Sequence, residues 1–323
     1  MELSWLLVFK IGASLAGVIV GIGSFSELPW SVKLKITAVL LAGVILIGLL
    51  AWPLASPLEP LGAVSMPHFG GVVILAGLAV LTGFIGYFLS WPDGREIGIL
   101  AVPAGLAVWA VRSGSMAELM RTTVPTLARR QSLFAAMKWE PIFWLAIVAA
   151  GFIGVLIAQR LVSRSSKLVP RPLSIVSIVI AVVGSGLVAQ LCIGIFAQDI
   201  RIADSRLGSV VAQPAIGQII FAVFVSFGIA AFLVKKFLNV GYIWPIAASA
   251  LITVFAVTTY TSGDKLRYLA EHYPPAFFCP SITSILPVQM VALGVLGSIA
   301  GYWLAVRYDY WRENLSVPAK AEP

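Results

Sequence analysis

The sequence predicts an all-α membrane protein, a single bundle of about nine transmembrane helices. Charged residues make up only 11% of the 323 residues, whereas a soluble domain places charge at about a quarter of its positions. The mean hydropathy is correspondingly high, at +0.97. The apolar residues form continuous runs, without the alternation typical of β-barrel strands. Because every backbone polar group inside lipid must be paired within its own segment, such runs fold as helices.

The clearest run extends from Leu173 to Gln198 and contains no charged residue. About 20 apolar residues, rising ~1.5 Å each in a helix, cross the ~30 Å hydrocarbon layer of a bilayer. Just before this run lie Arg160, Arg164, Lys167 and Arg171. Basic residues beside an apolar run are typical of the loop that flanks a membrane span.

Eight further runs resemble this one in length and composition. The nine predicted spans are Trp5–Ser24, Ile36–Leu54, Gly70–Trp91, Ile97–Val111, Pro141–Gln159, Leu173–Gln198, Ala215–Val234, Leu238–Tyr260 and Pro287–Val306. The first has no basic residues before it and no clear cleavage site after it, so we expect a span there and not a secretory signal. The fourth is short and contains Pro103 and Gly105, so a re-entrant segment is the alternative.

These spans predict one transmembrane domain over residues 1–306 and a polar C-terminal tail over 307–323. Apolar residues recur at helical spacing between residues 113 and 140, with arginines between them and Pro125 in the middle. This pattern indicates two short amphipathic helices at the membrane interface, with a solvated loop as the alternative. Residues 261–286 are expected to form an outer loop containing a short helix that ends before Pro274 and Pro275.

The net charge of +8 arises from short basic clusters beside the apolar runs. At such positions lysine and arginine orient spans and meet anionic lipid headgroups, so nucleic-acid binding is not expected. Their distribution favours an external N-terminus and a cytoplasmic C-terminus. We therefore expect a multi-pass protein of a cell membrane, most simply the bacterial cytoplasmic membrane.

Two segments hint at an internal repeat. Leu78–Ser90 (LAVLTGFIGYFLS) and Leu293–Ala305 (LGVLGSIAGYWLA) both contain the pattern Gly-Tyr-aromatic-Leu. The hypothesis that follows is a repeated three-helix unit, formed by spans one to three and spans seven to nine. Chance similarity between apolar helices is the alternative.

The residue types needed for catalysis are scarce within the predicted spans. All fourteen acidic residues lie outside or at the edge of these spans, which weakens the case for an ion-driven transporter. The two histidines, His68 and His272, both fall in predicted loops, which argues against a bis-histidine haem or an HExxH metal site. Ser185 has no histidine base in a span to activate it. We therefore predict no catalytic, cofactor or metal site.

Two sets of residues remain as candidates. Gln190, Gln218, Ser226 and Pro245 are polar or helix-breaking residues within spans, and they form a candidate polar path. The second set consists of GxxxG pairs, which let membrane helices approach closely. These candidate packing residues are Gly17, Gly21, Gly297 and Gly301.

The sequence favours a non-catalytic structural or accessory subunit of a membrane complex. Its expected partners are the lipid bilayer and, through the glycine faces, other membrane proteins or a second copy of the chain. Packing within the chain is the alternative use of those faces. The alternative function is a transporter or channel for a small or lipid-like molecule.

Overall fold

The structure, a computed structural model, describes residues 29–55, 69–123, 126–162, 174–273 and 276–316. Within these residues, eight helices are long and apolar enough to cross a membrane, which confirms the predicted fold class of a polytopic helical bundle. The first predicted span, Trp5–Ser24, lies outside the described residues, together with Gly17 and Gly21.

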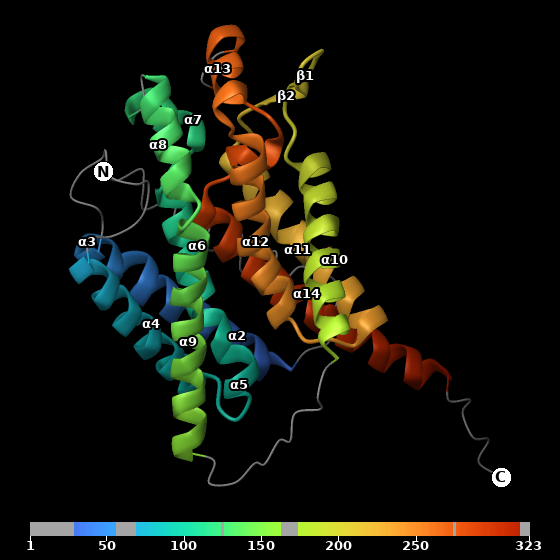
Figure 1. The fold of residues 1–323 in the computed structure, drawn as a ribbon. Helices are drawn as coiled ribbons and strands as arrows, with labels where there is room; N and C mark the ends of the chain where they lie inside the picture. The colour runs from blue at the N-terminus through green and yellow to red at the C-terminus, as the bar shows by residue number, and fades with distance from the viewer. Residues whose placement is uncertain (1–28, 56–68, 124–125, 163–173, 274–275, 317–323) are drawn as a thin grey trace, which may run out of the picture.

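The eight spans fall into two groups of four in chain order (Figure 1). Unit 1 consists of four spans. The first is α2 (Trp30–Gly43), continued by η2 (Val44–Leu50) and α3 (Ala51–Ala55), and the second is α4 (Phe69–Leu89). The third is formed by α5 (Gly94–Ile97), η3 (Gly98–Leu100) and α6 (Ala101–Arg112), and the fourth is α9 (Glu140–Val162). Unit 2 consists of α10 (Ile175–Phe196), α11 (Ile216–Leu238), α12 (Ile243–Tyr260) and α14 (Pro287–Ser316).

The remaining elements gather at one end of the bundle, here called the cap end, at the top of Figure 1. They are α7 (Met116–Thr123), α8 (Leu127–Met137), α13 (Gly263–His272), η4 (Ser281–Ser284) and the strands β1 (Arg201–Asp204), β2 (Gly208–Ala212) and β3 (Phe277–Phe278). The strands form a small antiparallel sheet in the order β1-β2-β3. The opposite end, where α14 finishes, is called the tail end.

The fourth predicted span forms a complete crossing. Helices α5, η3 and α6 together run from Gly94 to Arg112, and every residue of α6 before Arg112 is buried. Pro103 is the third residue of α6, in the first turn of the helix, where a missing N–H breaks no intrahelical bond. The short apolar run reflects a helix surrounded by protein and not a re-entrant segment.

The two units share the same internal packing. In each unit the second and fourth helices form the most extensive pair, α4 with α9 and α11 with α14. A Cβ atom at Gly83 would collide with the carbonyl oxygen of Gly151, and one at Gly297 would collide with that of Phe224. Both pairs therefore depend on backbone approaching backbone, the usual way in which membrane helices associate.

Prolines mark equivalent positions in the two units. Pro103 and Pro245 are each the third residue of the third helix, and Pro141 and Pro287 each lie in the first turn of the fourth helix. Between the units, α6 contacts α14, α12 contacts α9, and α9 contacts α14. Such reciprocal pairs are what approximate two-fold symmetry produces. The described spans are therefore arranged as two similar four-helix units.

This arrangement differs from the repeated three-helix unit that the sequence suggested. That hypothesis matches α4 with α14, whereas the packing matches α4 with α11. Gly86 of α4 faces Gly98 and Ala101, while Gly301 of α14 faces Gly228 of α11. The shared Gly-Tyr-aromatic-Leu pattern therefore occupies two different environments. The repeated three-helix unit stays a prediction, because its first span lies outside the described residues.

The segment between residues 113 and 140 contains the two expected helices, α7 and α8. Their apolar side chains are buried, among them Met120 and Phe134, while Arg129 is exposed. Helix α8 packs against α12 and α13 and stacks above α9 in Figure 1. The apolar face of α8 thus covers the cap end of the bundle. At the other end, the expected polar tail begins as a helix, because α14 continues to Ser316.

Gly301→Ala is expected to destabilise the bundle by about 1–3 kcal/mol, the usual cost of overpacking, because the added methyl group would meet the backbone of Gly228. Gly184→Ala is the matched control, since no atom of the described residues lies within 4 Å of a Cβ at that position on α10. The measurement is the thermal unfolding midpoint in mild detergent. Equal midpoints for the two variants would contradict the close contact between α11 and α14.

Candidate functional site

The four residues of the candidate polar path lie on three helices and at different depths. Gln190 of α10 donates to the hydroxyl of Tyr260 at the end of α12, over 3.4 Å. Gln218 of α11 donates to the carbonyl oxygens of Phe196 at 3.0 Å and Gln198 at 2.7 Å. Gln218 therefore satisfies carbonyls that the C-terminus of α10 leaves without helical partners.

The other two residues lie closer to the tail end. Ser226 is buried on α11, and its hydroxyl has no hydrogen-bond partner among the described residues. Pro245 is buried in the first turn of α12, at the opposite end of that helix from Tyr260. At ~1.5 Å per residue, Pro245 and Tyr260 are separated by roughly 22 Å along the helix. The structure thus brings Gln190 and Gln218 to the cap end of α10 and leaves Pro245 remote from them.

Gln289 of α14 makes the most buried polar contact between the two units. Its side chain is 2% exposed and donates to the carbonyl oxygens of Ala110 at 3.3 Å and Gly114 at 2.9 Å, at the end of α6. The Gln289 amide oxygen also accepts from the N–H of Leu286 at 3.1 Å. The glutamine therefore caps its own helix and bonds to unit 1 with the same amide group.

A second glutamine bonds elements of the cap nearby. The side-chain oxygen of Gln213, just after β2, accepts from the N–H of Ala117 in α7 at 3.1 Å. Its amide nitrogen donates to the carbonyl oxygens of Pro214 and Ser284, each at 3.3 Å. Gln213 and Gln289 are called the glutamine staples below. Gln289 bonds unit 2 to the end of α6 in unit 1, and Gln213 bonds α7, the cap helix that follows α6, to the segments that precede α11 and α14.

Neither glutamine staple was predicted from the sequence. For Gln289 a signal exists, because a glutamine three residues after the residue that precedes a helix commonly bonds back to that residue's N–H, as in a capping box. The local half of its role was thus predictable from the position of Gln289 two residues after Pro287. The bonds to Ala110 and Gly114 join segments far apart in the chain, which no local pattern reveals.

Gln289→Leu is expected to lower the stability of the bundle by about 1–3 kcal/mol, since two buried carbonyls and one N–H lose their partner. Gln190→Leu serves as the control, because it removes only one long bond to Tyr260. Unfolding in detergent followed by circular dichroism gives the measurement. If Gln190→Leu proved the more damaging of the two, the structural role assigned to Gln289 would be wrong.

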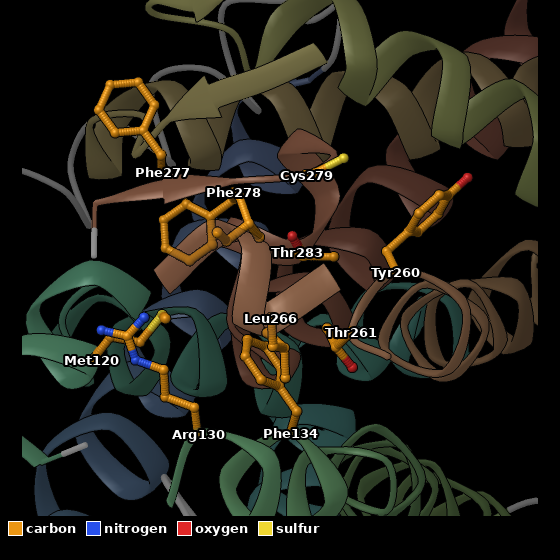
Figure 2. Close-up of a pocket in the computed structure, with 11 residues that line it drawn as sticks. Met120, Arg130, Phe134, Tyr260, Thr261, Leu266, Phe277, Phe278, Cys279 and Thr283 are labelled. Atoms are coloured by element: carbon orange, nitrogen blue, oxygen red, sulfur yellow. The ribbon is translucent and has the colours of Figure 1, made fainter. Parts of the chain in front are cut away.

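A small pocket lies between the cap elements, as Figure 2 shows. Its lining includes Arg130 and Phe134 of α8, Leu266 of α13, Phe278 of β3 and the free thiol of Cys279. The enclosed volume is about 10 Å³, which is the space needed by one water molecule. The pocket is a packing gap at the junction of the two units, too small for a substrate.

Asp204 organises the polar surface of the cap. It ends β1, and one of its oxygens accepts from the backbone N–H of Leu207 at 2.7 Å and of Arg206 at 2.8 Å, which shapes the turn into β2. The other oxygen accepts from the hydroxyls of Tyr273 at 2.8 Å and Tyr268 at 3.0 Å. Asp204 therefore ties the β1–β2 hairpin to α13 and to the residue after it.

These bonds shift the titration of both partners. The hydrogen bond from Leu207, followed by that from Tyr273, lowers the pKa of Asp204 to about 2. The same contact raises the pKa of Tyr273 to about 12. The Asp204 contribution to stability is complete above its ordinary pKa of 3.8 and is lost as the pH falls through 2. The Tyr273 contribution is complete below its ordinary pKa of 10.0 and is lost as the pH rises through 12.

Asp204→Asn is expected to loosen the hairpin, because a neutral amide replaces a carboxylate that accepts four hydrogen bonds. Protection of residues 201–212 against hydrogen exchange should fall at neutral pH. The difference from the unmodified protein should shrink as the pH approaches 2, where Asp204 itself becomes neutral. Asp199→Asn, on an exposed residue before β1, should leave the protection unchanged, and a similar loss there would argue against a specific tie.

Among the described residues, no group of three His, Cys, Asp or Glu side chains is placed to hold a metal ion. Glu140 is fully buried at the first residue of α9 although the sequence places it at the edge of a span.

The chain matches no known protein-family model, and neither a curated protein nor a solved structure is significantly similar to it.

Proposed function

We propose that this integral membrane protein is a non-catalytic structural or accessory subunit of a membrane complex. The observation that carries the proposal is the pair of glutamine staples, Gln213 and Gln289, which bond unit 2 and the segments before α11 and α14 to the end of α6 and to the cap helix that follows it. Transporters of repeated architecture work by moving one unit against the other. Units held together by buried bonds are better suited to a fixed scaffold.

The distribution of polar groups supports the same proposal. Gln218 and Gln289 use their amide groups on backbone carbonyls at helix ends, and the pocket in the cap has room for one water molecule. The central helices α6 and α14 are mostly buried, while α10 presents most of its surface outward. The protein would thus offer partners a rigid apolar flank and a folded polar cap.

Purification from native membranes in a mild detergent tests the proposal. Native mass spectrometry should give a defined complex containing this chain and a partner in fixed stoichiometry. The control is the same chain produced in a host that lacks the partner, which should yield the chain without it. A lone monomer from native membranes, at every detergent strength, would contradict a role as a subunit.

A transporter or channel for a small or lipid-like molecule is the second candidate. It is favoured by the two similar four-helix units, since transporters built from repeats place substrate sites between the repeats near the middle of the membrane. Release of small solutes from liposomes that contain the purified chain would support this candidate. Protein-free liposomes and liposomes with Gln289→Leu protein provide the comparison, because weakening the staple should alter the release if the units move.

A further inference from the structure

Two lysines at the tail end of α11 are held over aromatic rings of α14. The ammonium nitrogen of Lys236 lies 4.3 Å from the ring centre of Tyr308, and that of Lys235 lies 5.4 Å from the ring centre of Tyr302. Lys235 also donates to the side-chain oxygen of Asn239. We call these four residues, the two lysines and the two tyrosines, the basic–aromatic cluster.

The cluster lies where α11 leaves the membrane. Lysine and arginine near the end of a helix compensate its dipole and orient the span, and those roles explain the presence of the charges. They do not explain why two consecutive lysines each place an ammonium group over a tyrosine from another helix. Cation–π contacts of this kind hold a charge in place while leaving its N–H donors available.

Among the described residues, neither lysine forms an ion pair with a carboxylate. The ion pair found there joins Lys35 to Asp93, at 3.0 Å. Asp309 lies on the same helix as the two tyrosines, and Glu96 of α5 acts electrostatically on Tyr302. In the part of the chain that the structure describes, however, no acidic oxygen lies within 4.0 Å of either ammonium group. The two lysines of the cluster therefore have no direct ion pair with a carboxylate of the described residues.

The surroundings of the cluster indicate its depth and the chemistry of a ligand that would suit it. Phe237 is 73% exposed beside the lysines, and Tyr310, two residues after Tyr308, is 64% exposed. Exposed aromatic side chains at the ends of spans mark the headgroup level of a bilayer. Further into the membrane, Ile229 of α11 and Leu304 of α14 present apolar surface outward, which suits acyl chains.

We propose that the basic–aromatic cluster binds the phosphate of an anionic glycerophospholipid, with Lys235 and Lys236 donating to the phosphate oxygens. Tyr302 and Tyr308 position the two ammonium groups, and the acyl chains lie along the outer faces of α11 and α14. Phosphate is the anion present at this depth, and basic pockets between transmembrane helices bind such headgroups. The ligand is a lipid because a lipid would contact both the positive charges of the lysines and the apolar surface of α11 and α14.

The experiment uses the full chain in mild detergent, with phosphatidylglycerol or phosphatidylcholine added during native mass spectrometry. The unmodified protein should retain phosphatidylglycerol in preference to phosphatidylcholine. In the variant Lys235→Gln/Lys236→Gln, the affinity for phosphatidylglycerol should fall about thirtyfold, roughly fivefold for each lysine. The matched control is Lys265→Gln/Arg267→Gln, which removes two positive charges from the cap, including a lysine 5.3 Å from the ring centre of Tyr260.

Two further measurements test the role of the Tyr308 ring and whether the ligand is a lipid. Tyr308→Phe keeps the ring and should retain the lipid, whereas Tyr308→Leu removes the ring beneath Lys236 and should weaken retention several-fold. Inorganic phosphate, added as a competitor, should displace little lipid. Equal loss in the cap control, equal retention of phosphatidylcholine, or full displacement by inorganic phosphate would each overturn the proposal. Circular dichroism of each variant verifies that the fold is unchanged.

Discussion

The structure depends on the close approach of helix backbones at glycine. Lipid tails are as apolar as leucine, so burial of apolar surface gives membrane helices little reason to associate, and close packing must take its place. Gly83 with Gly151 in unit 1, and Gly297 and Gly301 against α11 in unit 2, bring the second and fourth helices of each unit into backbone contact. These two contacts fix the shape of each unit, and they leave the third helices, α6 and α12, to meet the other unit.

The glutamine staples determine how the two units are joined. Helix ends leave backbone groups without partners, and at the cap end Gln289 satisfies such groups on both α6 and α14. The Gln289 side chain therefore supplies hydrogen-bond partners to backbone groups of both units. The candidate packing residues Gly297 and Gly301 face α11 within the same chain, so this glycine face stabilises unit 2. The outward faces belong to peripheral helices such as α10.

The sequence was sufficient to predict the spans that the structure describes, because each span must satisfy its own backbone and so carries its own signal. Local features also predicted the helices α7, α8 and α13. The similarity of the two four-helix units was not predicted, because sequence similarity between apolar helices is weak evidence for a repeat. The more informative feature is the pair of prolines at equivalent turns, Pro103 and Pro245. The glutamine staples were missed because their bonds join residues far apart in the chain, as Gln289 and Ala110 are.

The bonds between units are unevenly placed along the membrane normal. Gln289 crosses between units at the cap end, where Gln213 bonds α7 to the segments before α11 and α14, and where α8 packs against α12 and α13. At the tail end, the contacts of Lys35 with Asp93 and of Lys236 with Tyr308 stay within one unit. At the same end, Glu96 of α5 acts electrostatically on Tyr302 of α14, so the two units also interact there. A lipid bound by the basic–aromatic cluster would lie at that end, where it would bear on the freedom of unit 2.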